Sequence, residues 1–91
     1  MKETHPEVVQ DLIQRMRKIE GQARGIQRML EENASCEAIL IQLSAMRSAI
    51  NKVGMKAIGC HLGSKMADEL ARGGKAQDAV EEIMEAFLRF S

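Results

Sequence analysis

The sequence predicts an all-α protein. Its single proline stands at position 6, so the rest of the 91-residue chain is free to form helices. Aromatic residues make up only 2% of the chain, and hydrophobic residues make up 45%. An interior of Ala, Ile, Leu and Met favours helix packing over a β-sandwich. We expect a three-helix chain with two long helices in an antiparallel hairpin and a short third helix, in one domain spanning residues 1–91.

The first predicted helix carries apolar residues at alternating steps of three and four, which is a heptad seam. Thr4 is expected to cap its start, with Pro6 in the first turn and Glu7 reaching back. Asn33 is expected to end the helix near residues 31–34. The seam consists of Val9, Leu12, Met16, Ile19, Ala23, Ile26 and Leu30.

The second predicted helix starts at Ser35, a good N-cap residue, and Glu37 complements the helix dipole. It carries two apolar stripes, which indicates two packing partners: the neighbouring helix and another subunit. One stripe consists of Ile39, Leu43, Met46, Ile50, Val53, Ala57 and Cys60, and the other of Leu40, Leu43, Ala49, Met55, Ile58, Leu62 and Met66.

A break at residues 71–74 precedes the short third helix, whose predicted apolar face consists of Val80, Ile83, Met84 and Phe87. Three helices leave much of the second helix uncovered in a monomer. Exposed apolar surface of that kind usually marks a contact between subunits, so we expect a dimer or a larger oligomer.

Cys36 and His61 lie 25 residues apart in a stretch without proline. If one helix carries both, they are roughly 37 Å apart and cannot meet within one chain. They can meet between two chains whose second helices run antiparallel, which creates two symmetric sites. The midpoint falls between Ser48 and Ala49, among small residues suited to a close helix crossing.

The candidate metal ligands are few. Cys36 and Cys60 are soft ligands and His61 is a borderline one. Cys60 is more simply explained as a packing residue of the seam, and its alternatives are a metal ligand or a disulfide partner of Cys36. His5, near the N-terminus, is a weaker candidate because a terminal histidine is usually solvated. We expect a soft or borderline metal ion, and no organic cofactor.

The net charge is zero, with 13 basic and 13 acidic residues, but the distribution is uneven. One stretch of the first helix is rich in cations, and a symmetric oligomer repeats it along a DNA duplex. The other reading of such a run is a solvated helix face. Because no aromatic side chain is placed to stack on bases, we expect binding through phosphate contacts and DNA shape. These cations are Arg15, Arg17, Lys18, Arg24 and Arg28.

Several classes of function are disfavoured. No apolar stretch approaches the roughly 20 residues of a membrane span, and no secretory signal is visible. Two cysteines without a secretory context are typical of reduced thiols, so we expect a cytoplasmic protein. No hydrolytic triad, phosphate loop or pair of acids in a pocket is evident, so an enzyme is not expected.

The stretch RKIEGQARGIQRMLEE at residues 17–32, with Cys36, QLSAMRSA at residues 42–49 and His61-Leu62, resembles the CsoR/RcnR/FrmR family of bacterial repressors. The resemblance covers nearly the full length. It implies a disc-shaped tetramer built from dimers with antiparallel second helices, which releases operator DNA when an inducer binds. Known inducers include copper, nickel, cobalt and zinc ions, formaldehyde and reactive sulfur.

The resemblance also assigns residues. The family's sensor thiol matches Cys36, and its histidine, supplied by the other subunit, matches His61. The acidic residue that supports the copper ligands matches Glu81. Basic residues implicated in DNA contact match Arg15 and, in type, Lys52.

This chain departs from each known subtype. Where copper and persulfide sensors carry a second thiol, and nickel sensors a histidine, it has Lys65. The formaldehyde sensors use an N-terminal proline, whereas here Lys2 follows Met1 and Pro6 is internal. The inducer therefore stays open between a metal ion and a thiol-reactive compound. We predict a DNA-binding repressor derepressed at an intersubunit Cys36–His61 site; the alternative is a helical oligomer that sequesters metal without binding DNA.

Overall fold

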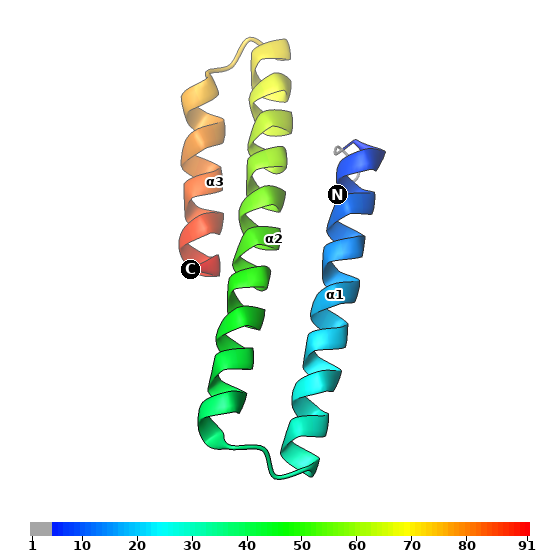
Figure 1. Ribbon diagram of the computed structural model, residues 1–91. Coiled ribbons are helices and arrows are strands. Elements are labelled where there is room, and N and C mark those ends of the chain that lie inside the picture. Colours follow the sequence, from blue (N-terminus) through cyan, green and yellow to red (C-terminus); the bar gives the residue numbers. More distant parts are fainter. Residues whose placement is uncertain (1–4) are drawn as a thin grey trace. The chain divides into compact units, whose positions relative to one another are not determined.

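The computed structural model describes residues 5–91, and within them the chain forms three helices and no strand. These are α1 (Pro6–Glu31), α2 (Cys36–Ala71) and α3 (Ala76–Phe90), shown in Figure 1. The predicted all-α class and the order of two long helices and a short one are confirmed. Thr4, expected to cap the first helix, and Lys2 lie outside the described residues. No helix within residues 5–91 is both long and apolar enough to cross a membrane.

Short-range hydrogen bonds explain where α1 ends and α2 begins. Asn33 adopts a φ of 57°, in the left-handed region that asparagine tolerates, and the Ala34 N–H donates to the Met29 carbonyl at 2.9 Å. The Ser35 hydroxyl then accepts a hydrogen bond from the Ala38 N–H at 3.1 Å. Both the stop at Asn33 and the cap at Ser35 are as the sequence predicted.

The end of α2 has the same backbone pattern as the end of α1. Gly73 adopts a φ of 78°, a conformation that glycine reaches without steric cost, and the Gly74 N–H donates to the Glu69 carbonyl at 2.7 Å. This confirms the break predicted at residues 71–74.

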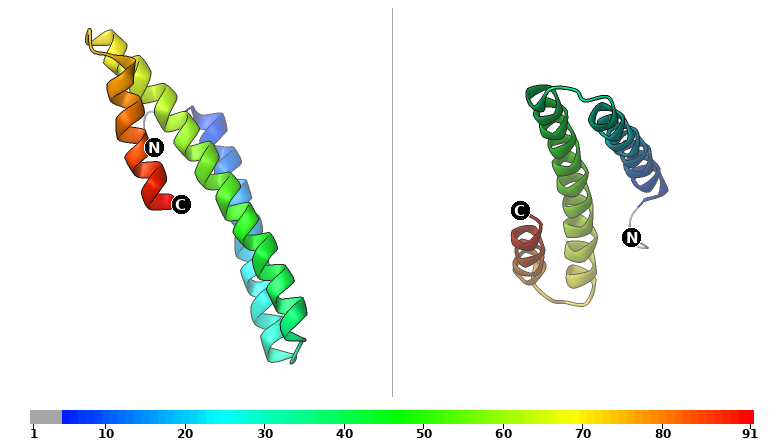
Figure 2. Two further views of the ribbon diagram at one scale, coloured as in Figure 1. Left: turned by 90° about the vertical axis from the view of Figure 1, so that its left-hand side faces the viewer. Right: turned by 90° about the horizontal axis from the view of Figure 1, so that it is seen from below.

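The chain divides into two compact units. The hairpin unit, Gln10–Val53, contains most of α1 and the first half of α2; the terminal unit contains residues 5–9 and Gly54–Ser91. Figure 2 shows the two helices of the hairpin unit running antiparallel, and α3 folded back along the second half of α2 within the terminal unit. The single-domain prediction stays a prediction.

The core of the hairpin unit comes from α1, whose buried residues Leu12, Ile19 and Ile26 recur every seven positions. They face α2, where Met46 and Val53 are half-buried. The other predicted seam residues of α1 are less covered. This pattern is expected of a helix that has one neighbour within its own chain.

In the terminal unit the buried residues are Ala79 and Ile83 of α3. Of the predicted apolar face of the third helix, Ile83 is buried and Phe87 is half-buried, whereas Val80 and Met84 are exposed in the single chain and the small Ala79 is buried instead. Alanine lets the two helices approach closely, so the contact face turns toward it and away from the larger side chains.

Candidate functional site

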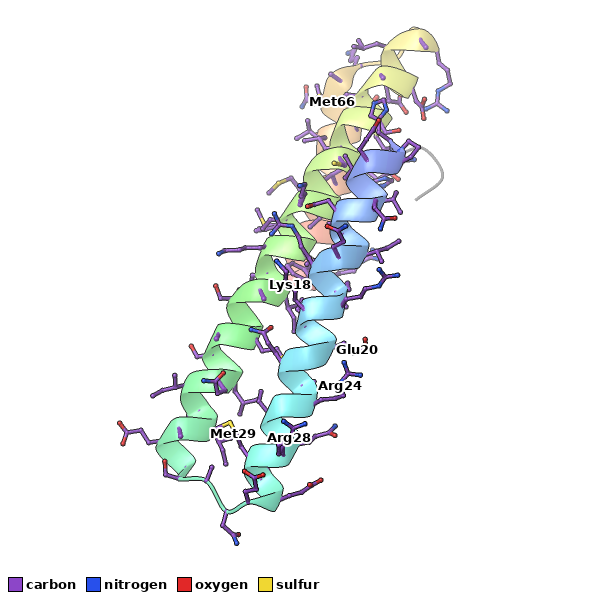
Figure 3. All side chains as sticks on the ribbon, turned by 45° about the vertical axis from the view of Figure 1, so that its right-hand side comes forward. Lys18, Glu20, Arg24, Arg28, Met29 and Met66 are labelled. Atoms are coloured by element: carbon purple, nitrogen blue, oxygen red, sulfur yellow. The ribbon has the colours of Figure 1, made fainter. Side chains whose placement is uncertain are left out.

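A polar cavity of about 410 Å³ lies in the hairpin unit. Three cations line it: Arg15 and Lys18 from α1, and Lys52 from α2. Figure 3 shows Lys18 beside α2, on the flank of α1 where this cavity opens. We call it the cationic cavity; its other lining residues are Asp11, Gln14, Gln22, Ala45, Ser48 and Ala49.

Small residues make room for the cationic cavity. Ala45, Ser48 and Ala49 of α2 present little side-chain volume opposite the long polar side chains of α1. The sequence suggested that these small residues mark a crossing between subunits, whereas within one chain they form a cavity wall. The Oε1 atom of Gln22 is buried there and has no hydrogen-bond partner within the described chain.

One acid, Asp11, lies among the three cations of this cavity. The Arg15 Nε donates to the Asp11 Oδ2 at 2.9 Å, one helical turn away on α1. Both side chains are partly exposed, at 41% for Arg15 and 37% for Asp11. The guanidinium is therefore held on the wall of the cavity and still reaches solvent.

The remaining predicted DNA-contacting cations of α1 lie elsewhere. Arg17, Arg24 and Arg28 are exposed, and Figure 3 shows Arg24 projecting from the side of α1 away from α2. Helix periodicity places all three on one side of α1, opposite the buried Ile19. The structure thus divides the six predicted cations into a clustered set of three and an outer stripe of three.

An apolar groove of about 450 Å³ lies on the other flank of the hairpin unit. Ile13 and Met16 of α1, which are exposed, line it together with Met46 of α2. Arg17 and Glu20 stand at its edge. The hairpin unit therefore has a cationic flank and an apolar flank.

Cys36 is the first residue of α2 and is exposed, and its thiol is not in a disulfide. It precedes Leu43 by seven residues, and Leu43 precedes Met46 by three and Ile50 by seven, so these side chains share one face of α2. That face continues the apolar groove.

His61 lines a cavity of about 270 Å³ in the terminal unit. The acids on this cavity are Glu82 and Glu85 of α3, and Arg89 lies beside them. Glu81, which the family resemblance assigns to support the site, is exposed, and its Oε1 accepts a hydrogen bond from Gln77 at 3.3 Å. Its role stays a prediction.

Lys65 lies one helical turn beyond His61, and its Nζ is 3.4 Å from the Glu82 Oε1. Cys60 is half-buried and its thiol is not in a disulfide, and His5 is exposed at the start of α1. Within residues 5–91, no three His, Cys, Asp or Glu side chains are grouped so that they could hold a metal ion.

Residues 9–89 match a family model described as metal-sensitive transcriptional repressor. The chain belongs to this family. The predicted resemblance is confirmed, and so is the prediction that the chain is a regulator rather than an enzyme.

Curated relatives in the metal-sensitive repressor family include two copper sensors. The copper-sensing transcriptional repressor CsoR of Bacillus subtilis is 35% identical over 77 residues, covering 85% of this chain and 75% of the relative. The copper-sensing repressor RicR of Mycobacterium tuberculosis is 41% identical over 64 residues, covering 70% and 67%. The transcriptional repressor RcnR of Escherichia coli is 32% identical over 83 residues, covering 88% and 91%.

Solved structures of the family have the same fold. The copper-sensing repressor CsoR of Geobacillus thermodenitrificans, determined with Cu(I), matches with a TM-score of 0.80 and 32% identity over 94% of this chain and 88% of that one. The nickel-responsive regulator InrS matches with a TM-score of 0.78 and 33% identity over 90% and 91%. Family members thus differ in the metal they sense while they keep the fold.

Sequence reasoning missed three residues of these sites. Asp11 was not singled out, although its spacing of four from Arg15 is the usual signal of an ion pair on a helix. Glu82 and Glu85 were not assigned to the site either. Their position beside His61 depends on how α3 turns against α2, which the periodicity of α3 did not give correctly.

Proposed function

We propose that this protein is a cytoplasmic DNA-binding repressor that releases its operator when a metal ion binds between Cys36 of one protomer and His61 of the partner subunit. The observation that carries the proposal is the two-sided hairpin unit. One flank gathers Arg15, Lys18 and Lys52 around a cavity, and the other is apolar. A subunit that covers the apolar flank leaves the cationic flank open to DNA.

The assembly follows from uncovered apolar surface. No residue of α2 is buried in the isolated chain, although the helix is rich in aliphatic side chains. On the face that continues the apolar groove, Leu40 is 58% exposed and Leu43 is 40% exposed. A second copy of the chain is the natural cover, because a twofold axis pairs one apolar face with itself. When the two α2 helices run head to tail, Cys36 of one chain faces the second half of the other.

The DNA contact follows from charge. Cations from two helices converge in the cationic cavity, and phosphate is the group that such a cluster recognises. The outer stripe of α1 adds only short-range attraction, within about 8 Å at physiological salt, because its three arginines are solvated and screened. Affinity on this basis depends steeply on salt, and specificity comes from the shape of the duplex.

The donor set suits a soft or borderline metal ion. A thiolate and an imidazole, with the Cys60 thiolate as a third ligand, match Cu(I) or Zn(II) better than Ni(II). Lys65 stands where the family's copper sensors carry a second thiol, and its ammonium is directed toward Glu82. The metal would join the two subunits, and we expect the binding to disfavour the DNA-competent arrangement by about 1–3 kcal/mol.

The test begins with duplex DNA that the wild-type protein selects from a random-sequence pool. Fluorescence anisotropy of this duplex is followed while the reduced protein is titrated with Cu(I), Zn(II), Ni(II), formaldehyde or polysulfide. We expect release by Cu(I) or Zn(II) in the wild type and no release in Cys36→Ser. Cys60→Ser is the matched thiol control, and it should keep a weakened response.

Other results would redirect the proposal. Release by formaldehyde or polysulfide alone would make the protein a sensor of thiol-reactive compounds. Full release from the Cys36→Ser protein would remove the sensor role of this thiol. If no duplex is selected and binding is blind to sequence at two salt concentrations, the protein is a metal-sequestering oligomer instead.

A further inference from the structure

Asp11 is an acid inside a cavity that we assign to DNA phosphates. Its carboxylate lies among three cations, where a negative charge opposes the binding of another anion. An acid at this place favours phosphate binding only through a second effect that outweighs the repulsion.

The geometry of the ion pair supplies that effect. Asp11 Oδ2 accepts from Nε of Arg15, and this leaves the outer edge of the guanidinium, which carries the two Nη groups, for another partner. That outer edge is the one that binds a phosphate with two parallel hydrogen bonds. The carboxylate also restrains a side chain that is 41% exposed and otherwise samples many rotamers.

We propose that Asp11 is a positioning residue for DNA binding, whose carboxylate orients the Arg15 guanidinium toward a backbone phosphate; this proposal rests on the proposed function. The carboxylate does not touch DNA. Because Arg15 is already ordered by the ion pair, it loses less conformational entropy when it binds the phosphate. This gain in the free energy of binding exceeds the repulsion between Asp11 and the phosphate across solvent.

Removing the carboxylate charge relieves the repulsion, which raises DNA affinity, and releases Arg15, which lowers it. One substitution therefore shows which effect is larger. Asp11→Asn keeps the size of the side chain and removes the negative charge. If charge alone decides, the variant binds the selected duplex more tightly than the wild type. If positioning decides, it binds about three- to tenfold more weakly, as expected when a charge-assisted hydrogen bond that orders a partly exposed arginine is lost.

Affinity of the selected duplex is measured between 50 and 300 mM salt, about the range over which phosphate contacts are resolved. For Asp11→Asn we expect weaker binding and a slope of log affinity against log salt that is smaller by at most about 0.9, the value for one phosphate contact. The matched control is Glu31→Gln, which removes an acid from the exposed end of α1 outside the cavity. It should bind as tightly as the wild type or slightly more tightly.

A double-substitution cycle completes the test. In an Arg15→Gln background, Asp11→Asn should no longer weaken binding, because there is no guanidinium left to orient. A nitrogen-15 spectrum adds an independent readout: the Nε–H signal of Arg15 should be sharp and protected in the free wild type and lose protection in Asp11→Asn.

Failures of the two proposals are distinguishable. If the wild type selects no duplex, the proposed function fails. If the wild type binds, Arg15→Gln weakens binding and Asp11→Asn strengthens it, only the positioning role of Asp11 is overturned. Equal weakening by Asp11→Asn in both backgrounds would also overturn that role, because it would show that the acid acts without Arg15.

Discussion

Replacing Gly54 with alanine tests how α3 is held against α2. A Cβ atom at Gly54 would overlap the ring of Phe90, near the end of α3. The overlap involves three ring atoms, so a small rotation of the ring does not relieve it. Alanine at this position must therefore displace Phe90 from the surface of α2.

The change in the free energy of unfolding follows from two opposing contributions, the lost burial of Phe90 and the higher helix propensity of alanine. Phe90 is 39% exposed, so about three-fifths of the burial of a phenylalanine is at stake, which is roughly 1–2 kcal/mol. Alanine in place of glycine inside a helix gains about 1 kcal/mol. We expect Gly54→Ala to leave the free energy of unfolding unchanged or to lower it by up to about 1 kcal/mol.

Urea unfolding followed by circular dichroism, at one fixed protein concentration, measures this balance in four proteins: the wild type, Gly54→Ala, Phe90→Ala and the double variant. In the Phe90→Ala background the alanine displaces no ring, so Gly54→Ala should stabilise by about 1 kcal/mol. The coupling energy between the two substitutions should be about 1–2 kcal/mol.

Gly59→Ala is the matched control, because it lies in the same helix and a Cβ there meets nothing within 4 Å. It should stabilise both backgrounds by about the same 1 kcal/mol. The reasoning is refuted if Gly54→Ala stabilises the wild type as much as Gly59→Ala does, since the Phe90 contact would then have no energetic weight.

Three further predictions concern α2. Leu43→Glu should leave helix content unchanged and weaken self-association at least about tenfold, because a charge buried at the proposed subunit contact is costly; sedimentation velocity at several concentrations checks this. Ser35→Ala should lower the free energy of unfolding by about 1 kcal/mol in urea titrations, because the Ala38 N–H loses its capping partner. Lys65→Met should change that free energy by less than about 1 kcal/mol, because the pair with Glu82 is partly solvated; a larger loss would show that the pair is covered in the proposed assembly.

Much of the fold was predictable because its signals are local. The stop at Asn33 and the cap at Ser35 depend on residues within one turn of the helix ends, and the two glycines after α2 act the same way. The contact face of α3 was not predictable to the same degree. Its apolar residues cover a wide arc, and the choice of Ala79 over Val80 depends on how closely α2 approaches.

The candidate site was predictable as a list of residues more than as an arrangement. The cationic stretch of α1 was evident, but helix periodicity alone did not show that Arg15 and Lys18 join Lys52 in one cavity while Arg24 points away. That division depends on which side of α1 the hairpin buries. The pairing of Cys36 with His61 of the partner subunit stays a prediction, since it concerns contacts between chains.

The sequence by itself determined the helical class, the helix ends and the family, because capping, periodicity and motif residues act over a few positions. Only the tertiary structure decided that the hairpin has one cationic and one apolar flank, that Asp11 holds Arg15 at the cationic cavity, and that Glu82 lies beside His61 and Lys65. The reason is physical. These relations join residues on different helices or fix which flank of a helix faces solvent, and the rotation of each packed helix is set by the volumes of the side chains between them.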